Sequence, residues 1–138
     1  MEYLKILVVH RHEAMLEEIK LILEEFEPYM RCYHCGIDGL QAAKLEPFDL
    51  ILCGTDLPLI TGFEMIRSIR NLSRNCLTPV IFIADELIEE HQLLNRQLNG
   101  LGIVGRGNLS SNLNFILNHS TLMRSIKIKR PKPQLPDR

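Results

Sequence analysis

Short apolar segments alternate along this chain with segments whose apolar residues recur at helical spacing, and the alternation repeats five times. Each apolar segment is brief and rich in branched residues, which predicts a buried strand. The strands are expected at 4–9, 30–35, 50–53, 80–83 and 102–105, and the helices at 15–26, 37–45, 62–71, 87–98 and 110–123. Strands that alternate with helices form a parallel sheet covered on both faces. The pattern therefore predicts an α/β fold.

The stretch DLILCGTDLPLITG, residues 49–62, marks the expected functional centre. It reads as an apolar strand that runs into a loop with Gly54 and Pro58, followed by a helix that begins near Gly62. Proteins of this class place their chemistry at the carboxyl ends of the strands. Here, however, Gly54 and Thr55 stand where a reactive side chain is expected.

The net charge of −1 over 138 residues conceals an asymmetry between the body and the C-terminal end. From Arg124 onward there are six basic residues and one acid, whereas the preceding part has an excess of acids. We expect one folded domain at 1–124 and a basic, proline-rich tail or linker at 125–138 that is disordered or extended. The linker interpretation is favoured over contact of the tail with nucleic acid.

The N-terminus, MEYLKILVV, lacks the layout of a signal peptide, and no apolar run approaches the roughly 20 residues that cross a bilayer. We therefore expect a cytoplasmic protein without membrane contact. Ser110 or Ser111 is expected to cap the fifth helix.

Four cysteines include a single CxxC pair, Cys32 and Cys35, and no second pair follows. A structural zinc site is therefore not supported. Both cysteines fall inside the second predicted strand, where they would point to opposite faces, so we interpret them as small buried thiols. No glycine-rich phosphate-binding motif follows the first strand, and no cofactor is expected.

In combination, these segments resemble the receiver domain of bacterial response regulators. KILVV resembles the family's first strand, and residues 38–70, DGLQAAKLEPFDLILCGTDLPLITGFEMIRSIR, resemble its central segment. TPVIFIADE resembles its fourth strand, and GIVGRG its fifth. The resemblance covers about 3–123 and implies the flavodoxin-like (βα)5 doubly wound fold, with strand order 2-1-3-4-5.

The resemblance also locates the positions at which this family carries out phosphorylation, and none of them keeps the family's residue. Two acids after strand one hold a divalent cation, an Asp four residues before the loop proline accepts the phosphoryl group, and a Thr or Ser follows strand four. A lysine follows strand five, and an aromatic residue on strand five acts in switching. The corresponding residues here are His10, Arg11, Gly54, Ala84, Arg106 (or Gly107 if the loop is one residue longer) and Ile103.

These substitutions predict a receiver-like domain that lacks phosphoryl chemistry and is not an enzyme. Gly54 offers no carboxylate nucleophile, and the guanidinium of Arg11 repels a magnesium ion. An alternative is that Asp56 or Asp85 restores phosphorylation or metal binding.

Basic residues at the same positions leave two further interpretations open. Arg11 and Arg106 could form a pocket that binds an anion, or that Asp56 or Asp85 fills internally, although ordinary surface ion pairs are favoured. His10 and His12 with Asp56 could also be read as a transition-metal site, but this pattern is weak and no metal is expected.

The resemblance implies action through a protein partner or a homodimer, at the face formed by helix four, strand five and helix five, about residues 87–123. Leu87, Ile88, Leu93 and Leu94 would offer apolar contacts there, unless they belong to the core. An output domain beyond the C-terminus is a further expected partner.

Overall fold

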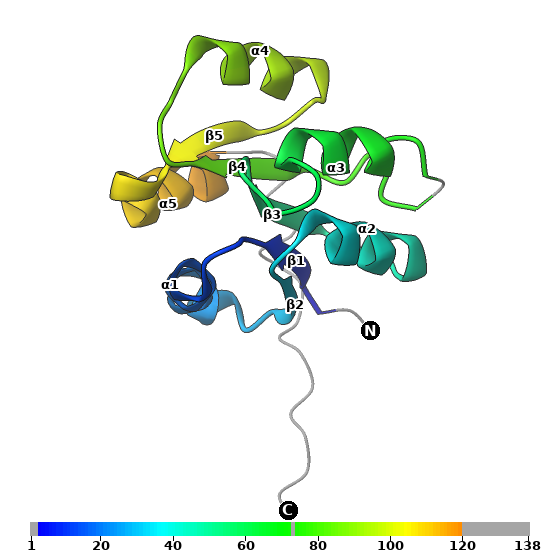
Figure 1. The fold of residues 1–138 in the computed structure, drawn as a ribbon. Coiled ribbons are helices and arrows are strands. Elements are labelled where there is room, and N and C mark those ends of the chain that lie inside the picture. The colour runs from blue at the N-terminus through cyan, green and yellow to red at the C-terminus, as the bar shows by residue number, and fades with distance from the viewer. Residues whose placement is uncertain (1–2, 73, 120–138) are drawn as a thin grey trace, which may run out of the picture.

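The computed structural model describes residues 3–72 and 74–119. Within these residues five strands alternate with five α-helices (Figure 1). The strands are β1 (Lys5–Val9), β2 (Tyr29–Tyr33), β3 (Leu50–Gly54), β4 (Val80–Ala84) and β5 (Gly102–Gly105). The helices are α1 (Glu13–Leu23), α2 (Gly36–Leu45), α3 (Gly62–Ile69), α4 (Glu89–Gln97) and α5 (Leu109–His119), with 3-10 turns at Glu24–Phe26 and Arg106–Asn108.

The five strands form one parallel sheet in the order β2-β1-β3-β4-β5, which confirms the predicted fold class and strand order. The inner strands β3 and β4 are buried along their whole length, because helices cover both faces of the sheet. That burial explains their continuous apolar sequences, LILC and VIFI.

Two apolar layers separate the sheet from its helices. On one face α1 and α5 pack together through a shared cluster that includes Leu16, Ile19, Leu113 and Leu117. On the other face α2, α3 and α4 pack against the sheet. Figure 1 shows the same arrangement, with α1 and α5 on one side and the other three helices on the opposite side. Because all five strands are parallel, their carboxyl ends lie at one edge of the sheet.

Several predicted boundaries were wrong by one or two residues. Strand β2 ends at Tyr33, so only Cys32 lies on it, whereas Cys35 precedes α2 as its N-cap residue. The prediction that both cysteines lie in one strand is therefore incorrect. Helix α4 begins at Glu89 rather than at residue 87.

The start of the fifth helix also differs from the prediction. The 3-10 turn Arg106–Asn108 runs directly into α5 at Leu109, so neither Ser110 nor Ser111 is an N-cap residue. The predicted end of this helix, 120–123, lies outside the described residues, as does the tail 125–138. Among the described helices, none has the length and apolar character needed to span a membrane.

Candidate functional site

The strand carboxyl ends bring together five of the six positions that the sequence singled out. His10 and Arg11 follow β1, Gly54 ends β3, Ala84 ends β4 and Arg106 follows β5. Because β1, β3, β4 and β5 are neighbours in the sheet, these residues meet at one edge. Ala84 is buried and carries no hydroxyl group.

The sixth position, Ile103, lies on β5 beside Phe82 of β4. It is partly buried and packs against the apolar layer beneath α2, α3 and α4. Ile103 therefore lies outside the group of five residues at the carboxyl ends of the strands.

His10 fills the centre of the site. Its side chain is only 5% exposed, and its Nδ1 atom accepts a hydrogen bond of 3.1 Å from the backbone N–H of His12. A Cβ atom placed on Gly54 would lie 3.0 Å from Cδ2 and 3.4 Å from Nε2 of the His10 ring. The imidazole thus occupies the space next to Gly54 where a side chain from β3 would begin.

Burial makes the charged form of His10 unfavourable and lowers its pKa from 6.5 to about 4. The neighbouring His12, Arg106 and Arg11 act in the same direction by charge repulsion, whereas Asp85 opposes them. His10 is consequently neutral at pH 7. Its hydrogen bond from His12 requires an unprotonated Nδ1, so the neutral ring carries its proton on Nε2.

A close approach between β3 and α3 builds the loop beside this centre. A Cβ atom on Gly62 would overlap the carbonyl oxygen of Gly54, so only glycine fits at the start of α3. The N–H of Gly62 donates to the carbonyl oxygen of Thr55 at 3.0 Å. A capping box between Thr61 and Glu64 then fixes the first turn of the helix.

Two ion pairs cross the mouth of the site. Arg11 Nη1 lies 2.8 Å from Asp56 Oδ2, and Arg106 Nη1 lies 3.4 Å from Asp85 Oδ1. All four side chains are exposed, and exposed pairs of this kind typically contribute about 0–1 kcal/mol each. The first pair joins the loops after β1 and β3, and the second joins the loops after β4 and β5.

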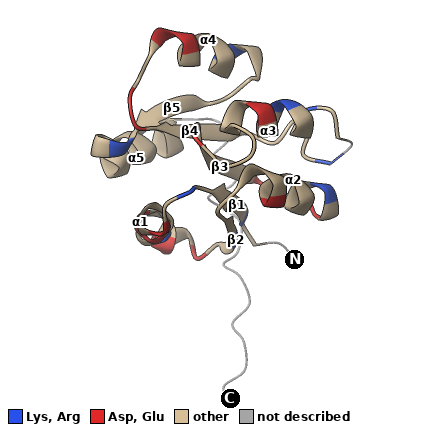
Figure 2. Ribbon diagram, viewed as in Figure 1, with Lys and Arg blue, Asp and Glu red and all other residues tan. Residues whose placement is uncertain are grey.

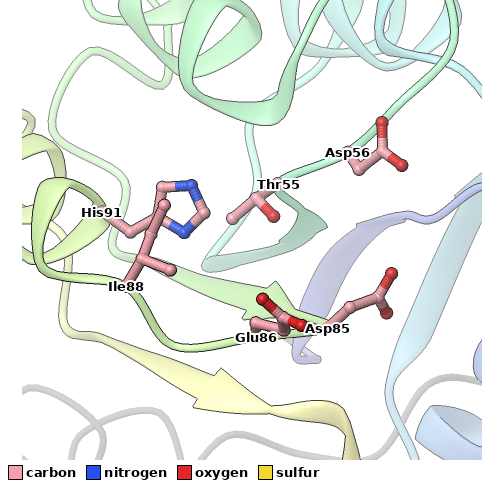
Figure 3. Close-up of a pocket in the computed structure, with 6 residues that line it drawn as sticks. All are labelled: Thr55, Asp56, Asp85, Glu86, Ile88 and His91. Atoms are coloured by element: carbon pink, nitrogen blue, oxygen red, sulfur yellow. The ribbon is translucent and has the colours of Figure 1, made fainter.

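An open pocket of about 360 Å³ lies on the α4 side of these ion pairs (Figure 3). Its lining residues include three acids, Asp56, Asp85 and Glu86, and the others are Thr55, Ile88 and His91. In Figure 3 the His91 ring projects from α4 toward Thr55.

Sequence reasoning did not single out His91 as a residue of this region. Its ring packs against Phe63 of α3 with centroids 5.1 Å apart, and its buried Nδ1 atom has no hydrogen-bond partner among the described residues. A signal for it was present in the sequence. His91 and the buried Asn95 are four residues apart, which places two polar side chains on the inward side of α4.

The candidate metal-binding residues are already engaged within the protein. The His10 and His12 rings are 5.6 Å apart, Nδ1 of His10 accepts from the backbone, and Asp56 pairs with Arg11. Over residues 3–72 and 74–119, no three His, Cys, Asp or Glu side chains are grouped so that they could hold a metal ion. Cys35 instead donates from Sγ to Asp38 at 3.3 Å.

Known proteins with the same architecture are numerous. CheY4, a chemotaxis protein of Vibrio cholerae, superposes with a TM-score of 0.73 at 20% identity over 83% of this chain and 99% of its own. The receiver domain of the sensor histidine kinase PA1611 from Pseudomonas aeruginosa, solved with a magnesium ion in its active-site cleft, gives 0.75 at 20% identity, covering 91% of this chain and 98% of its own.

Sequence comparison also finds similarity to response regulators. The cell cycle response regulator CtrA of Brucella ovis is 30% identical over 83 residues, which are 59% of this chain and 34% of that protein. The match thus spans about a third of the curated relative. The family model for the response regulator receiver domain matches residues 6–101, more than two thirds of the sequence. The chain therefore belongs to the response regulator receiver domain family.

Proposed function

We propose that this receiver domain of two-component signalling is a pseudo-receiver: it is not phosphorylated at the usual position and acts by binding a protein partner. The observation that carries the proposal is the packing of His10 against Gly54. Loss of the nucleophilic carboxylate alone would leave an empty space at the end of β3. Here a buried imidazole packs against Gly54, which supports a site built without an aspartate side chain at this position.

The residues around Gly54 also do not fit the divalent cation that accompanies phosphorylation in the family. Magnesium prefers oxygen ligands, but the residues after β1 are the His10 ring and the Arg11 guanidinium. The nearest alternative carboxylates, Asp56 and Asp85, face arginines across the two ion pairs. This arrangement supports a domain that transfers no phosphoryl group and catalyses no reaction.

An anion-sensing role through Arg11 and Arg106 receives less support from the geometry. Arg11 pairs with Asp56 and Arg106 pairs with Asp85. An anion would therefore have to displace one of these two carboxylates. Both are exposed ion pairs, which is the interpretation that we favoured from the sequence. We therefore place protein binding ahead of anion binding.

The face formed by α4, β5 and α5 is the proposed partner or dimer surface. Leu87, Ile88 and Leu93 are exposed there, together with Phe115 of α5. Leu94, in contrast, is partly buried and packs against the core. Exposed apolar side chains on these elements favour association with another protein surface. An output domain attached beyond residue 138 remains part of this proposal.

A phosphorylation assay tests the proposal directly. The protein is incubated with acetyl phosphate and magnesium, and its intact mass is measured beside a receiver domain that has the usual aspartate. We expect no gain of a phosphoryl group. Incorporation that disappears in Asp56→Asn or Asp85→Asn would identify a substitute acceptor and overturn the proposal. Incorporation that survives both changes would overturn it as well.

A further inference from the structure

The outward side of α1 carries one large exposed apolar side chain with acids around it. Leu21 is 70% exposed, and the residues three and four positions before and after it are Glu17, Glu18, Glu24 and Glu25. Residues at these spacings are neighbours on a helical surface, and the 3-10 turn continues the helix past Leu23. All four glutamates are exposed, and Figure 2 shows acidic residues along α1. We refer to these five residues as the acidic face of α1.

Little within the described part of the chain neutralises this face. Glu17 forms an ion pair with Lys20 at 3.1 Å, whereas Glu18, Glu24 and Glu25 form no ion pair with any described residue. The buried residues of α1 lie on its other side, against the sheet and α5. Leu21 and its glutamates therefore form a helix face without a partner.

The course of the chain brings its C-terminal part to this face. Helices α1 and α5 cover the same side of the sheet and both run opposite to the strands, so both end at the same edge. His119, the last residue of α5, accordingly lies at the end of the molecule where α1 passes into Glu24 and Glu25. Nineteen further residues, 120–138, follow it in the sequence.

The chemistry of those residues complements the acidic face of α1. Residues 125–132 read SIKIKRPK, with four cations and no acid. The two isoleucines, Ile126 and Ile128, alternate with lysines, so the segment offers apolar side chains to Leu21 and cations to the glutamates. We propose that the basic segment 125–132 docks on the acidic face of α1 of the same molecule.

The available chain length is sufficient for this contact. Eight extended residues span about 27 Å, whereas the eleven residues of α1 span about 16 Å. The basic segment can therefore run along the whole helix after a short connection from His119.

A second acidic segment, 85–90, is a less suitable docking site for the tail. It contains four acids with Leu87 and Ile88, and all six residues are exposed. However, it follows β4 at the carboxyl edge of the sheet, opposite to the edge where α5 ends. One of its acids, Asp85, is already paired with Arg106. The contact with α1 is independent of the proposed loss of phosphorylation.

Backbone amide NMR on the full chain tests this contact. The tail variant replaces Lys127, Lys129, Arg130 and Lys132 with Gln, and its spectrum is compared with that of the wild-type protein. We expect shift changes in the amides of residues 17–25, and we expect the difference between the two proteins to vanish at about 1 M salt, where the screening length falls to about 3 Å. The triple variant Glu18→Lys/Glu24→Lys/Glu25→Lys should lose the same contact.

A matched triple variant in the other acidic segment, Glu86→Lys/Glu89→Lys/Glu90→Lys, makes the same change of charge and should leave the tail-dependent shifts at α1 intact. Combining the α1 variant with Lys127→Glu/Lys129→Glu/Arg130→Glu should restore the contact.

Unchanged α1 amides after neutralisation of the tail would overturn the proposal. Shifts at 85–90 instead would assign the tail to the other segment. Shifts at α1 that depend on protein concentration would assign the occupant to a second copy of the chain, against the proposal.

Discussion

The ring of His10 lies 3.0 Å from the point where a Cβ atom on Gly54 would be placed. This distance is shorter than ordinary van der Waals contact between carbon atoms, so a side chain on Gly54 would require the ring to move by a few tenths of an ångström. The imidazole is buried and held by the backbone N–H of His12, which limits its freedom to move aside. The identities of residues 10 and 54 are therefore physically dependent on each other.

The first prediction concerns this dependence. Gly54→Ala should destabilise the wild-type protein by about 1–3 kcal/mol, because the added methyl group displaces a packed ring. In the His10→Ala background the same change should cost less, giving a coupling energy of about 0.5–3 kcal/mol. Urea unfolding of the wild type, both single variants and the double variant measures this coupling. Additive effects within about 0.5 kcal/mol would contradict the proposed contact.

The second prediction follows from the low pKa of His10. Its pKa is about 4 in the folded state, against the ordinary histidine value of 6.5 in the unfolded chain. Below pH 6.5 the unfolded state therefore binds a proton that the folded state does not bind. Stability from this group is fully present above pH 6.5 and is lost as the pH falls toward 4. The difference corresponds to about 3 kcal/mol.

The variant His10→Gln lacks the titrating group and provides the comparison. We expect the free energy of unfolding of the wild type to fall by about 3 kcal/mol more than that of His10→Gln between pH 7 and pH 4. Denaturant unfolding at several pH values measures both curves. Parallel curves would show that His10 does not take up its proton in this range.

The sequence was sufficient to predict the sheet, because β3 and β4 are continuous apolar runs that only a strand buried on both faces explains. The end of β2 and the start of α2 were less predictable. Nothing in the run from Met30 to Cys35 indicates that the strand stops at Tyr33, and α2 then starts at Gly36, where Ile60 packs against the glycine.

The site was predictable in its residues but not in its contacts. Family resemblance located His10, Gly54 and Arg106, yet no spacing in the sequence indicates that one residue fills the space beside another. The partners of Arg11 and Arg106 were foreseen only as alternatives, because an exposed arginine can reach several carboxylates. His91 was missed because the leucines around it dominate the periodicity of α4.

The third prediction concerns the contact between Gly62 and the end of β3. A methyl group on Gly62 overlaps the carbonyl oxygen of Gly54, and backbone atoms cannot move aside as a flexible side chain can. We expect Gly62→Ala to destabilise the protein by about 3 kcal/mol or more, with α3 shifted from β3. Gly107→Ala is the control, since a Cβ atom there meets nothing within 4 Å. Chemical denaturation should find this control within about 1 kcal/mol of the wild type, and equal losses in both variants would contradict the steric explanation.

The fourth prediction concerns Leu59, in the loop between β3 and α3. Its φ angle of 76° lies in the left-handed region, and its side chain is 81% exposed, so little packing offsets the backbone strain. A left-handed conformation costs a residue with a Cβ atom about 1–2 kcal/mol, whereas glycine adds about 0.4–1 kcal/mol of unfolded-state entropy. Leu59→Gly should therefore stabilise the protein by about 0.5–1 kcal/mol. Leu77→Gly, at an equally exposed position without a positive φ, should destabilise it, and thermal unfolding of the two variants should show opposite shifts. A fall in melting temperature for both would mean that the loop gains more from the leucine side chain than its exposure indicates.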